Sequence, residues 1–107
     1  MKYNIQKLFN RGYTATVKRG CITNKTKPID FINKLKEELK EVEESTDNYS
    51  DHILEVGDII ETAKNYLMYL CEDPIKIIEK VVIKNEKRAK GLKPDKYHRF
   101  RNFTFIN

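Results

Sequence analysis

The segment that decides the fold is residues 29–44, which read IDFINKLKEELKEVEE. Its large aliphatic residues recur at spacings of three and four: Ile32, Leu35, Leu39 and Val42. On an α-helix this spacing forms one narrow apolar stripe, which we expect to border the core. Asp30 stands near the start, where it either caps the helix or lies in its first turn. The pattern therefore predicts a helix over residues 29–44.

Two more helices are expected after the polar turn cluster at residues 45–50. The first runs from Asp51 to Cys71 and carries its own apolar stripe: Ile53, Val56, Ile60, Ala63, Leu67 and Leu70. The second starts at Pro74, because proline fits the first helical turn, and ends near Lys90 before Gly91. Its β-branched run at 77–83 leaves a strand as the less favoured alternative. The predicted fold class is all-α, a bundle of three to four main helices.

The two ends of the chain are less regular. Residues 3–10 have helical spacing, and Gly12 is expected to end that helix, with a loop over residues 14–28. Residues 92–107 mix aromatic and basic side chains, and we expect a tail that is either an extended arm or a short helix. The whole chain, residues 1–107, is predicted to be a single domain with its core at about residues 29–91.

Composition limits the class of protein. A chain of 107 residues with 39% hydrophobic and 35% charged residues can bury one core and is not typical of disorder. No apolar stretch approaches the ~20 residues of a membrane span, and no secretory signal is recognisable. Cys21 and Cys71 lack metal-ligand spacing and are interpreted as packing thiols. A cytoplasmic location is the expectation.

Charge is segregated along the chain. Residues 1–28 carry seven Lys or Arg and no acid, and residues 76–107 carry ten basic and three acidic residues. Residues 29–75 carry four basic and thirteen acidic residues. Such a chain can fold so that both signs line one cleft, which would suit a metal bound to a polyphosphate. Simple solubility and nucleic-acid binding are the other interpretations of the same pattern.

Two pairs of acids stand out. Glu38 and Glu41 lie three residues apart on one predicted helix, and Glu55 and Asp58 do so on the next. At ~100° per residue, Glu38 flanks the apolar stripe, and the second pair is bracketed by apolar neighbours. In an antiparallel hairpin the four carboxylates would converge. Their repulsion would need protonation or a cation, which could be Lys or Arg from another helix or a hard divalent ion such as Mg²⁺ that takes carboxylate oxygens.

These residues resemble a known family. The segments LKEELKE at 35–41 and EVGD at 55–58 are similar to the Glu-x-x-Glu and Glu-x-x-Asp motifs of the MazG-like, all-α nucleoside triphosphate pyrophosphohydrolases. Dimeric dUTPases and dCTP pyrophosphatases belong to the same superfamily. Gly57 before the last acid is also typical and is expected to allow close helix approach. The sequence NEKR at 85–88 loosely resembles the last helix of these enzymes.

The resemblance implies hydrolysis of a (deoxy)nucleoside triphosphate between the α and β phosphates, to a monophosphate and pyrophosphate. It implies Mg²⁺, with Mn²⁺ as a substitute, and the ligands Glu38, Glu41, Glu55 and Asp58. Glu41 is the first candidate for the catalytic base, with Glu38 as the other catalytic carboxylate. The nucleotide-binding candidates are Lys84, Asn85, Lys87, Arg88 and Tyr13. Tyr13 stands about where many relatives have a base-stacking Trp, which this chain lacks.

The resemblance also implies a homodimer or homotetramer, with part of the nucleotide site supplied by a second subunit. Base preference does not carry over. Two other functions fit the sequence: a basic helical nucleic-acid-binding protein, and a catalytically silent helical interaction module. The nucleic-acid alternative rests on the basic residues and aromatic rings after residue 80, which could bind phosphates and stack on bases. It leaves the two acid pairs unexplained.

Overall fold

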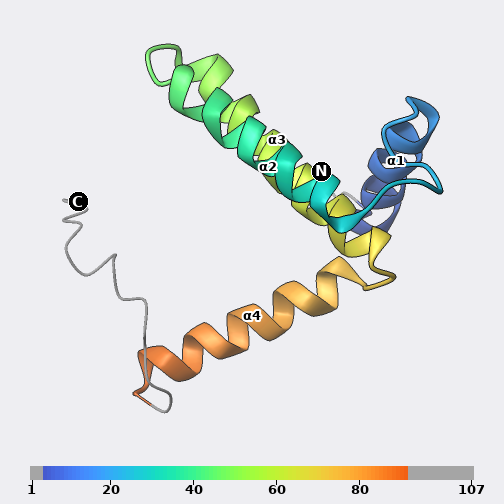
Figure 1. Cartoon of the computed structure of the whole chain (residues 1–107). Coiled ribbons are helices and arrows are strands. Elements are labelled where there is room, and N and C mark those ends of the chain that lie inside the picture. The colour runs from blue at the N-terminus through green and yellow to red at the C-terminus, as the bar shows by residue number, and fades with distance from the viewer. Residues whose placement is uncertain (1–3, 92–107) are drawn as a thin grey trace. The chain divides into compact units, whose positions relative to one another are not determined.

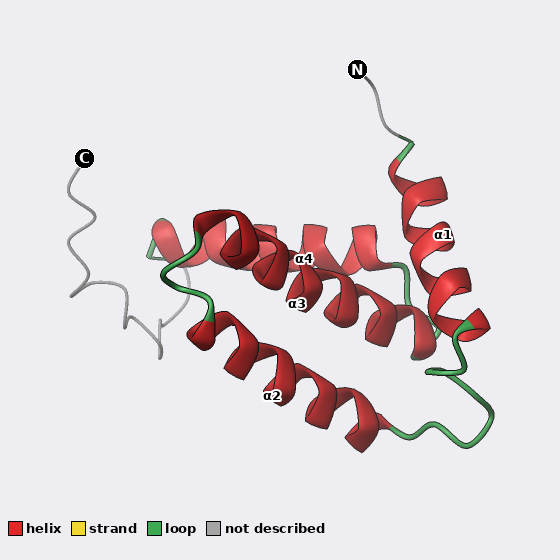
Figure 2. Ribbon diagram, turned by 90° about the horizontal axis from the view of Figure 1, so that it is seen from above, coloured by secondary structure: helices red, strands yellow, loops and turns green. Residues whose placement is uncertain are grey.

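A computed structural model of the chain describes residues 4–91, and within them it contains four α-helices and no strand (Figures 1 and 2). The helices are α1 (Ile5–Lys18), α2 (Pro28–Glu44), α3 (Tyr49–Tyr69) and α4 (Pro74–Ala89). The all-α prediction is therefore confirmed, and the strand alternative at 77–83 is wrong. The predicted tail at 92–107 lies outside the described residues.

The chain forms two compact units, residues 1–74 and residues 75–107. In the first unit, α2 and α3 form an antiparallel hairpin and α1 packs against α3. The second unit contains nearly all of α4. Within residues 4–91, no helix combines the length and apolar character needed to cross a membrane.

Local hydrogen bonds define the predicted starts of α2 and α3. The backbone N–H of Lys27 donates to Asp30 Oδ2 at 2.8 Å, which places Asp30 in the first turn of α2. Asn48 caps α3 by accepting the N–H of Asp51 at 3.2 Å. Gly91, at φ +73°, follows α4, and glycine adopts this left-handed conformation without steric conflict.

The predicted end of α1 is wrong. The helix continues through Gly12 to Lys18, and the left-handed residue that follows it is Gly20, at φ +77°. A glycine inside a helix costs only about 1 kcal/mol relative to alanine, which tertiary contacts readily offset. Here Gly12 lies directly against the carboxylate of Glu61 on α3, so the missing side chain lets the two helices approach.

The α2–α3 hairpin is closed at one end by aromatic rings. Phe31, which is only 6% exposed, stacks on Tyr66 with ring centroids 4.8 Å apart and lies 5.0 Å from the ring of Tyr69. The hydroxyl of Tyr69 donates to the backbone oxygen of Thr26 at 2.6 Å, which ties the loop before α2 to α3. Stacked aromatic pairs of this kind contribute about 0.5–1.5 kcal/mol beyond their buried area.

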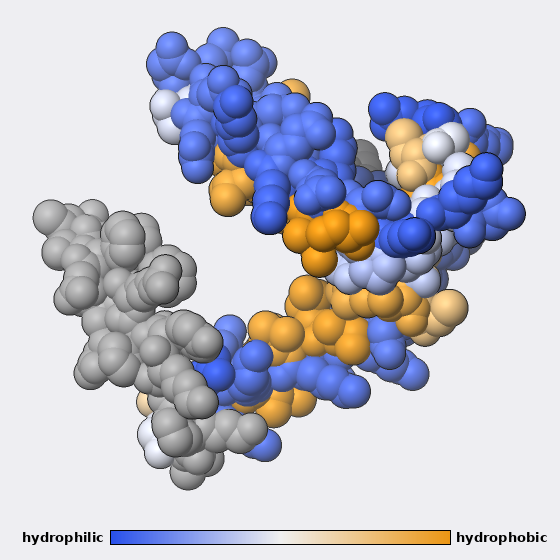
Figure 3. Space-filling view, viewed as in Figure 1, coloured by the Kyte–Doolittle hydropathy of each residue, from blue (hydrophilic) through white to orange (hydrophobic). Residues whose placement is uncertain are grey.

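The predicted apolar stripes do not form the interior of this chain. Leu39 is 52% exposed and Ile60 is 65% exposed, while the buried residues of the two helices include Glu38, Lys64 and Asn65. Lys64 and Asn65 are buried against α1, through Phe9 and Thr16, and much of each stripe lies at the surface of the described residues. Figure 3 shows apolar side chains at the surface of the α2–α3 pair.

Two smaller predictions also fail. A Cβ added at Gly57 would meet nothing within 4 Å in the described part of the chain, so this glycine does not mediate close approach between the helices α1 to α3. Cys21 and Cys71 are free and exposed and are not packing thiols. Cys71 lies just after α3 in a left-handed conformation, at φ +63°, which keeps it out of the helix hairpin.

Candidate functional site

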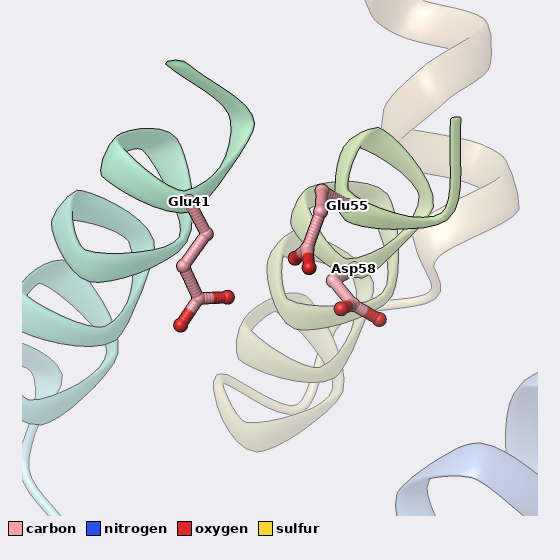
Figure 4. A group of neighbouring side chains, drawn as sticks. All are labelled: Glu41, Glu55 and Asp58. Atoms are coloured by element: carbon pink, nitrogen blue, oxygen red, sulfur yellow. The ribbon is translucent and has the colours of Figure 1, made fainter. Parts of the chain in front are cut away.

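Three carboxylates from two helices meet on one side of the hairpin. Glu41 on α2 and Glu55 and Asp58 on α3 each bring an oxygen to within 4.8 Å of the others. Figure 4 shows the α2 side chain extending toward the two α3 side chains. The three-residue spacing places Glu55 and Asp58 one above the other on α3, and the antiparallel hairpin brings α2 alongside. We call these three residues the acid cluster.

The acid cluster has no neutralising cation among the residues that the structure describes. Within residues 4–91, none of its three members forms an ion pair with Lys, Arg or His. Burial raises the pKa of Glu55, and its hydrogen bond with the Glu41 carboxyl and the charges of Glu41 and Asp58 raise it further. Its Oε2 atom is buried and has no hydrogen-bond partner among the described residues. Such an arrangement favours either a bound proton or a cation.

Glu38 lies one helical turn before Glu41 and is not part of the acid cluster. It is 5% exposed, as expected from its position at the flank of the apolar stripe, and its Oε1 has no partner in residues 4–91. Burial raises its pKa, while a hydrogen bond from Thr62 and the charge of Lys34 partly oppose that rise. The structure thus brings three of the four predicted ligands together and places the fourth beside them, buried.

A cavity of about 420 Å³ opens next to these acids. It is bounded by α1, α2, α3 and the segment between α1 and α2, and Glu38, Glu41 and Asp58 line one part of it. Arg19 and Lys34 also line it. Both signs of charge therefore line one cavity, as the segregated sequence suggested, but within residues 1–74 the positive charges come from α2 and the end of α1.

Sequence reasoning missed several residues of this cavity. Glu61 lines it one turn beyond Asp58, and its carboxylate pairs with Lys64 Nζ at 3.1 Å. Lys64, itself buried, donates to the backbone oxygen of Phe9 at 2.7 Å and so connects the site to α1. The regular spacing of Glu55, Asp58 and Glu61 on one helix face is the signal that could have identified Glu61.

The predicted nucleotide-binding residues lie elsewhere. Tyr13 is half-buried on α1 and is not among the residues that line the cavity. Four other candidates belong to α4 in the second unit: Lys84, Asn85, Lys87 and Arg88. Three of these are exposed and Arg88 is half-buried. Their role stays a prediction.

The donor chemistry of the acid cluster suits a hard divalent cation. An octahedral Mg²⁺ with oxygens at ~2.1 Å places neighbouring ligands roughly 3–4 Å apart, so three oxygens within 4.8 Å need only small side-chain movements. The cluster offers carboxylates alone, with no sulfur or imidazole that would favour zinc. No protein-family model, curated protein or solved structure matches this chain.

Proposed function

We propose that this protein is a Mg²⁺-dependent nucleoside triphosphate pyrophosphohydrolase. One observation carries the proposal: three carboxylates from two helices converge, with no ion pair to a cation in residues 4–91, beside a cavity lined by Arg19 and Lys34. Three carboxylates at these distances can hold a hard divalent cation, and Arg19 and Lys34 can contact phosphate oxygens. The resemblance of residues 35–41 and 55–58 to the MazG-like motifs supports the same reaction.

Glu41, Glu55 and Asp58 would hold the metal, which when bound neutralises phosphate charge and lowers the pKa of water. Glu38 is better placed than Glu41 to act as general base, because its Oε1 is buried without a hydrogen-bond partner in residues 4–91 and it lies outside the cluster. Its raised pKa brings it nearer the range in which a carboxylate accepts a proton efficiently.

In the proposed reaction, the oxygen of a water attacks the α-phosphorus and one of its protons passes to Glu38 Oε1. The bond between the α-phosphorus and the oxygen that bridges to the β-phosphorus breaks, and pyrophosphate leaves with that bridging oxygen. Arg19 and Lys34 would contact phosphate oxygens from the cavity side. The α4 residues Lys84, Asn85, Lys87 and Arg88 are proposed as a second phosphate-binding group.

We also propose that the protein works as a homodimer or homotetramer. Within residues 4–91 only two hydrophobic residues, Ile22 and Phe31, are buried, and no side chain is fully buried. Small domains depend heavily on buried apolar area for stability. A second copy of the chain covering the exposed stripes of α2 and α3 would supply that area.

The test of the activity is pyrophosphate release from a panel of nucleoside triphosphates with Mg²⁺, with Mn²⁺ and with chelator. Glu55→Gln and Asp58→Asn should each lower kcat/KM at least 100-fold, because each removes a metal-binding carboxylate. Glu43→Gln, an exposed acid on α2, is the matched control and should keep full activity. Metal-independent release, or full activity in both cluster variants, would contradict the proposal. No release from any nucleotide would overturn it and favour the nucleic-acid alternative.

A further inference from the structure

The cavity contains a second buried polar residue whose hydrogen bonds are incomplete. Asn65 on α3 is 3% exposed and lines the cavity. It lies seven residues after Asp58, on the same face of the helix. Its Oδ1 atom is buried and has no hydrogen-bond partner in residues 4–91.

The orientation of the Asn65 amide follows from its neighbour on α1. The hydroxyl of Thr16 donates its only proton to the backbone oxygen of Gly12 at 2.9 Å. Thr16 Oγ1 can therefore only accept from Asn65, and Nδ2 is the group that faces it, at 3.2 Å. If Oδ1 and Nδ2 of Asn65 were exchanged, Oδ1 would face the hydroxyl of Thr16, whose only proton is already donated to Gly12. The acceptor Oδ1 is therefore the end of the amide that lacks a hydrogen-bond partner in residues 4–91.

The position of Asn65 matches one part of a nucleotide. Seven residues of helix span about 10 Å, so Asn65 lies that far along α3 from Asp58. This is comparable with the span from an α-phosphate across the sugar to the far edge of a base. With phosphates at the acid cluster, the base would reach the part of the cavity lined by Asn65.

We propose that Asn65 determines base specificity by accepting a hydrogen bond from an exocyclic amino group, so that the substrates are cytosine or adenine nucleotides. In taking the ligand to be a nucleotide, this inference rests on the proposed function. An amino group has N–H donors for Oδ1. A carbonyl oxygen in the same place, as in uracil or hypoxanthine, would face Oδ1 with lone pairs opposed. Sites that pair a buried polar group with the substrate discriminate strongly against analogues that leave it unpaired.

The first test uses substrate pairs that differ in the amino and oxo groups at one position: dCTP against dUTP, and dATP against dITP. The wild type should favour the amino member of at least one pair by 10-fold or more in kcat/KM. Asn65→Leu, which keeps the branched shape and the number of side-chain heavy atoms and removes the acceptor, should bring that ratio to within about 3-fold of unity. Asn33→Leu, at an exposed position of α2, is the matched control and should keep the wild-type ratio.

A preference for the oxo member in both pairs, or an unchanged ratio in Asn65→Leu, would overturn the proposal. Because the ratio compares two substrates on one enzyme preparation, partial loss of folded protein does not affect it. Circular dichroism and the melting temperature show whether Asn65→Leu folds. If it does not, Asn65→Ser, with a shorter side chain and a hydroxyl, repeats the comparison and should also lower the ratio.

A second test does not depend on catalysis. Cys21 is exposed and lines the cavity, whereas Cys71 is exposed and does not line it. In the presence of Mg²⁺, dCMP or dAMP should slow the alkylation of Cys21 by N-ethylmaleimide at least 5-fold more than dUMP or dIMP. Alkylation of Cys71 should not change and so reports on the reagent itself.

The two tests separate the two proposals. If no triphosphate is hydrolysed but dCMP protects Cys21 better than dUMP, the pyrophosphohydrolase proposal fails and the base-recognition proposal stands. If triphosphates are hydrolysed without a preference for the amino member of either pair, the pyrophosphohydrolase proposal stands and the base-recognition proposal fails. Equal protection of Cys21 by all four monophosphates, or none by any, would overturn the assignment of Asn65.

Discussion

Glu41 and Glu55 bring carboxylate oxygens to within 4.8 Å of each other across the α2–α3 interface. Ionised carboxylates this close repel each other, so the arrangement favours a proton on Glu55, whose pKa is raised by burial and by its acidic neighbours, when no metal is bound. A divalent cation would replace that proton and hold the same two helices together. The acid cluster is therefore a point where protonation, metal binding and hairpin stability are linked.

The first prediction concerns pH and the metal-free protein. The pKa values of Glu38 and Glu55 are raised above the ordinary 4.5 in the folded chain, mainly by burial, so the folded state holds protons that the unfolded state has released. The protons held by Glu38 and Glu55 stabilise the folded state. This stabilisation is fully present below pH 4.5, and it is lost as the pH rises through the raised pKa values of the two groups. Urea denaturation in chelator, from pH 4 to 8, measures this decline.

Glu55→Gln should flatten that decline, because glutamine does not titrate. Asp47→Asn, at an exposed turn position, should leave the decline as it is in the wild type. A free energy of unfolding for metal-free wild type that stays constant or increases between pH 5 and 8 would contradict the linkage.

The second prediction concerns metal and stability. Mg²⁺ that binds only the folded chain at 100 times its Kd stabilises it by about 2.7 kcal/mol, which raises the melting temperature of a domain this size by on the order of 10 °C. Asp58→Asn should abolish the rise and should itself melt higher than wild type in chelator, since it removes repulsion within the acid cluster. Differential scanning calorimetry measures both effects. An equal Mg²⁺-dependent rise in Asp58→Asn would place the metal elsewhere.

The third prediction compares two glycines that both lie inside helices. Gly57→Ala adds a methyl group where nothing lies within 4 Å, so it should stabilise the chain by about 0.5–1 kcal/mol through helix propensity alone. Gly12→Ala has the same propensity gain but pushes its methyl into the Glu61 carboxylate and to 2.9 Å from Lys64 Nζ. It should be at least about 1 kcal/mol less stable than Gly57→Ala, because it displaces one partner of a buried lysine. Chemical denaturation of both variants checks this; equal stabilisation would mean that α1 does not pack on α3 as described.

Features set by local hydrogen bonds could be predicted from the sequence. Asp30 and Pro74 mark helix starts because their effects act within one turn, and Gly91 follows the last helix for the same reason. The buried position of Glu38 also followed from a helical wheel. The path of α1 could not be predicted, because Gly12 is helical through a contact with Glu61, which is 49 residues away.

The candidate site also combines local features, which could be predicted, with features that depend on contacts between distant residues, which could not. The acid pairs could be predicted because three-residue spacing has a local consequence on a helix. Arg19, Lys34 and Asn65 could not be assigned to a shared cavity, since the packing of α1 and of α2 against α3 brings them together. The outward direction of Leu39 and Ile60 was missed because apolar periodicity shows which residues share a face and not what covers that face.

The last prediction concerns those exposed stripes. Ile60 is 65% exposed in the single chain, and if a second copy covers it, a charge at this position would have to be buried without a partner. Ile60→Glu should therefore convert a homodimer or homotetramer into smaller species by light scattering coupled to size exclusion. Thr46→Glu adds the same charge at an exposed turn position and should leave the assembly intact. A wild-type protein that is monomeric at micromolar concentration, or an Ile60→Glu variant that assembles as the wild type does, would show that another surface or partner covers the α2 and α3 stripes.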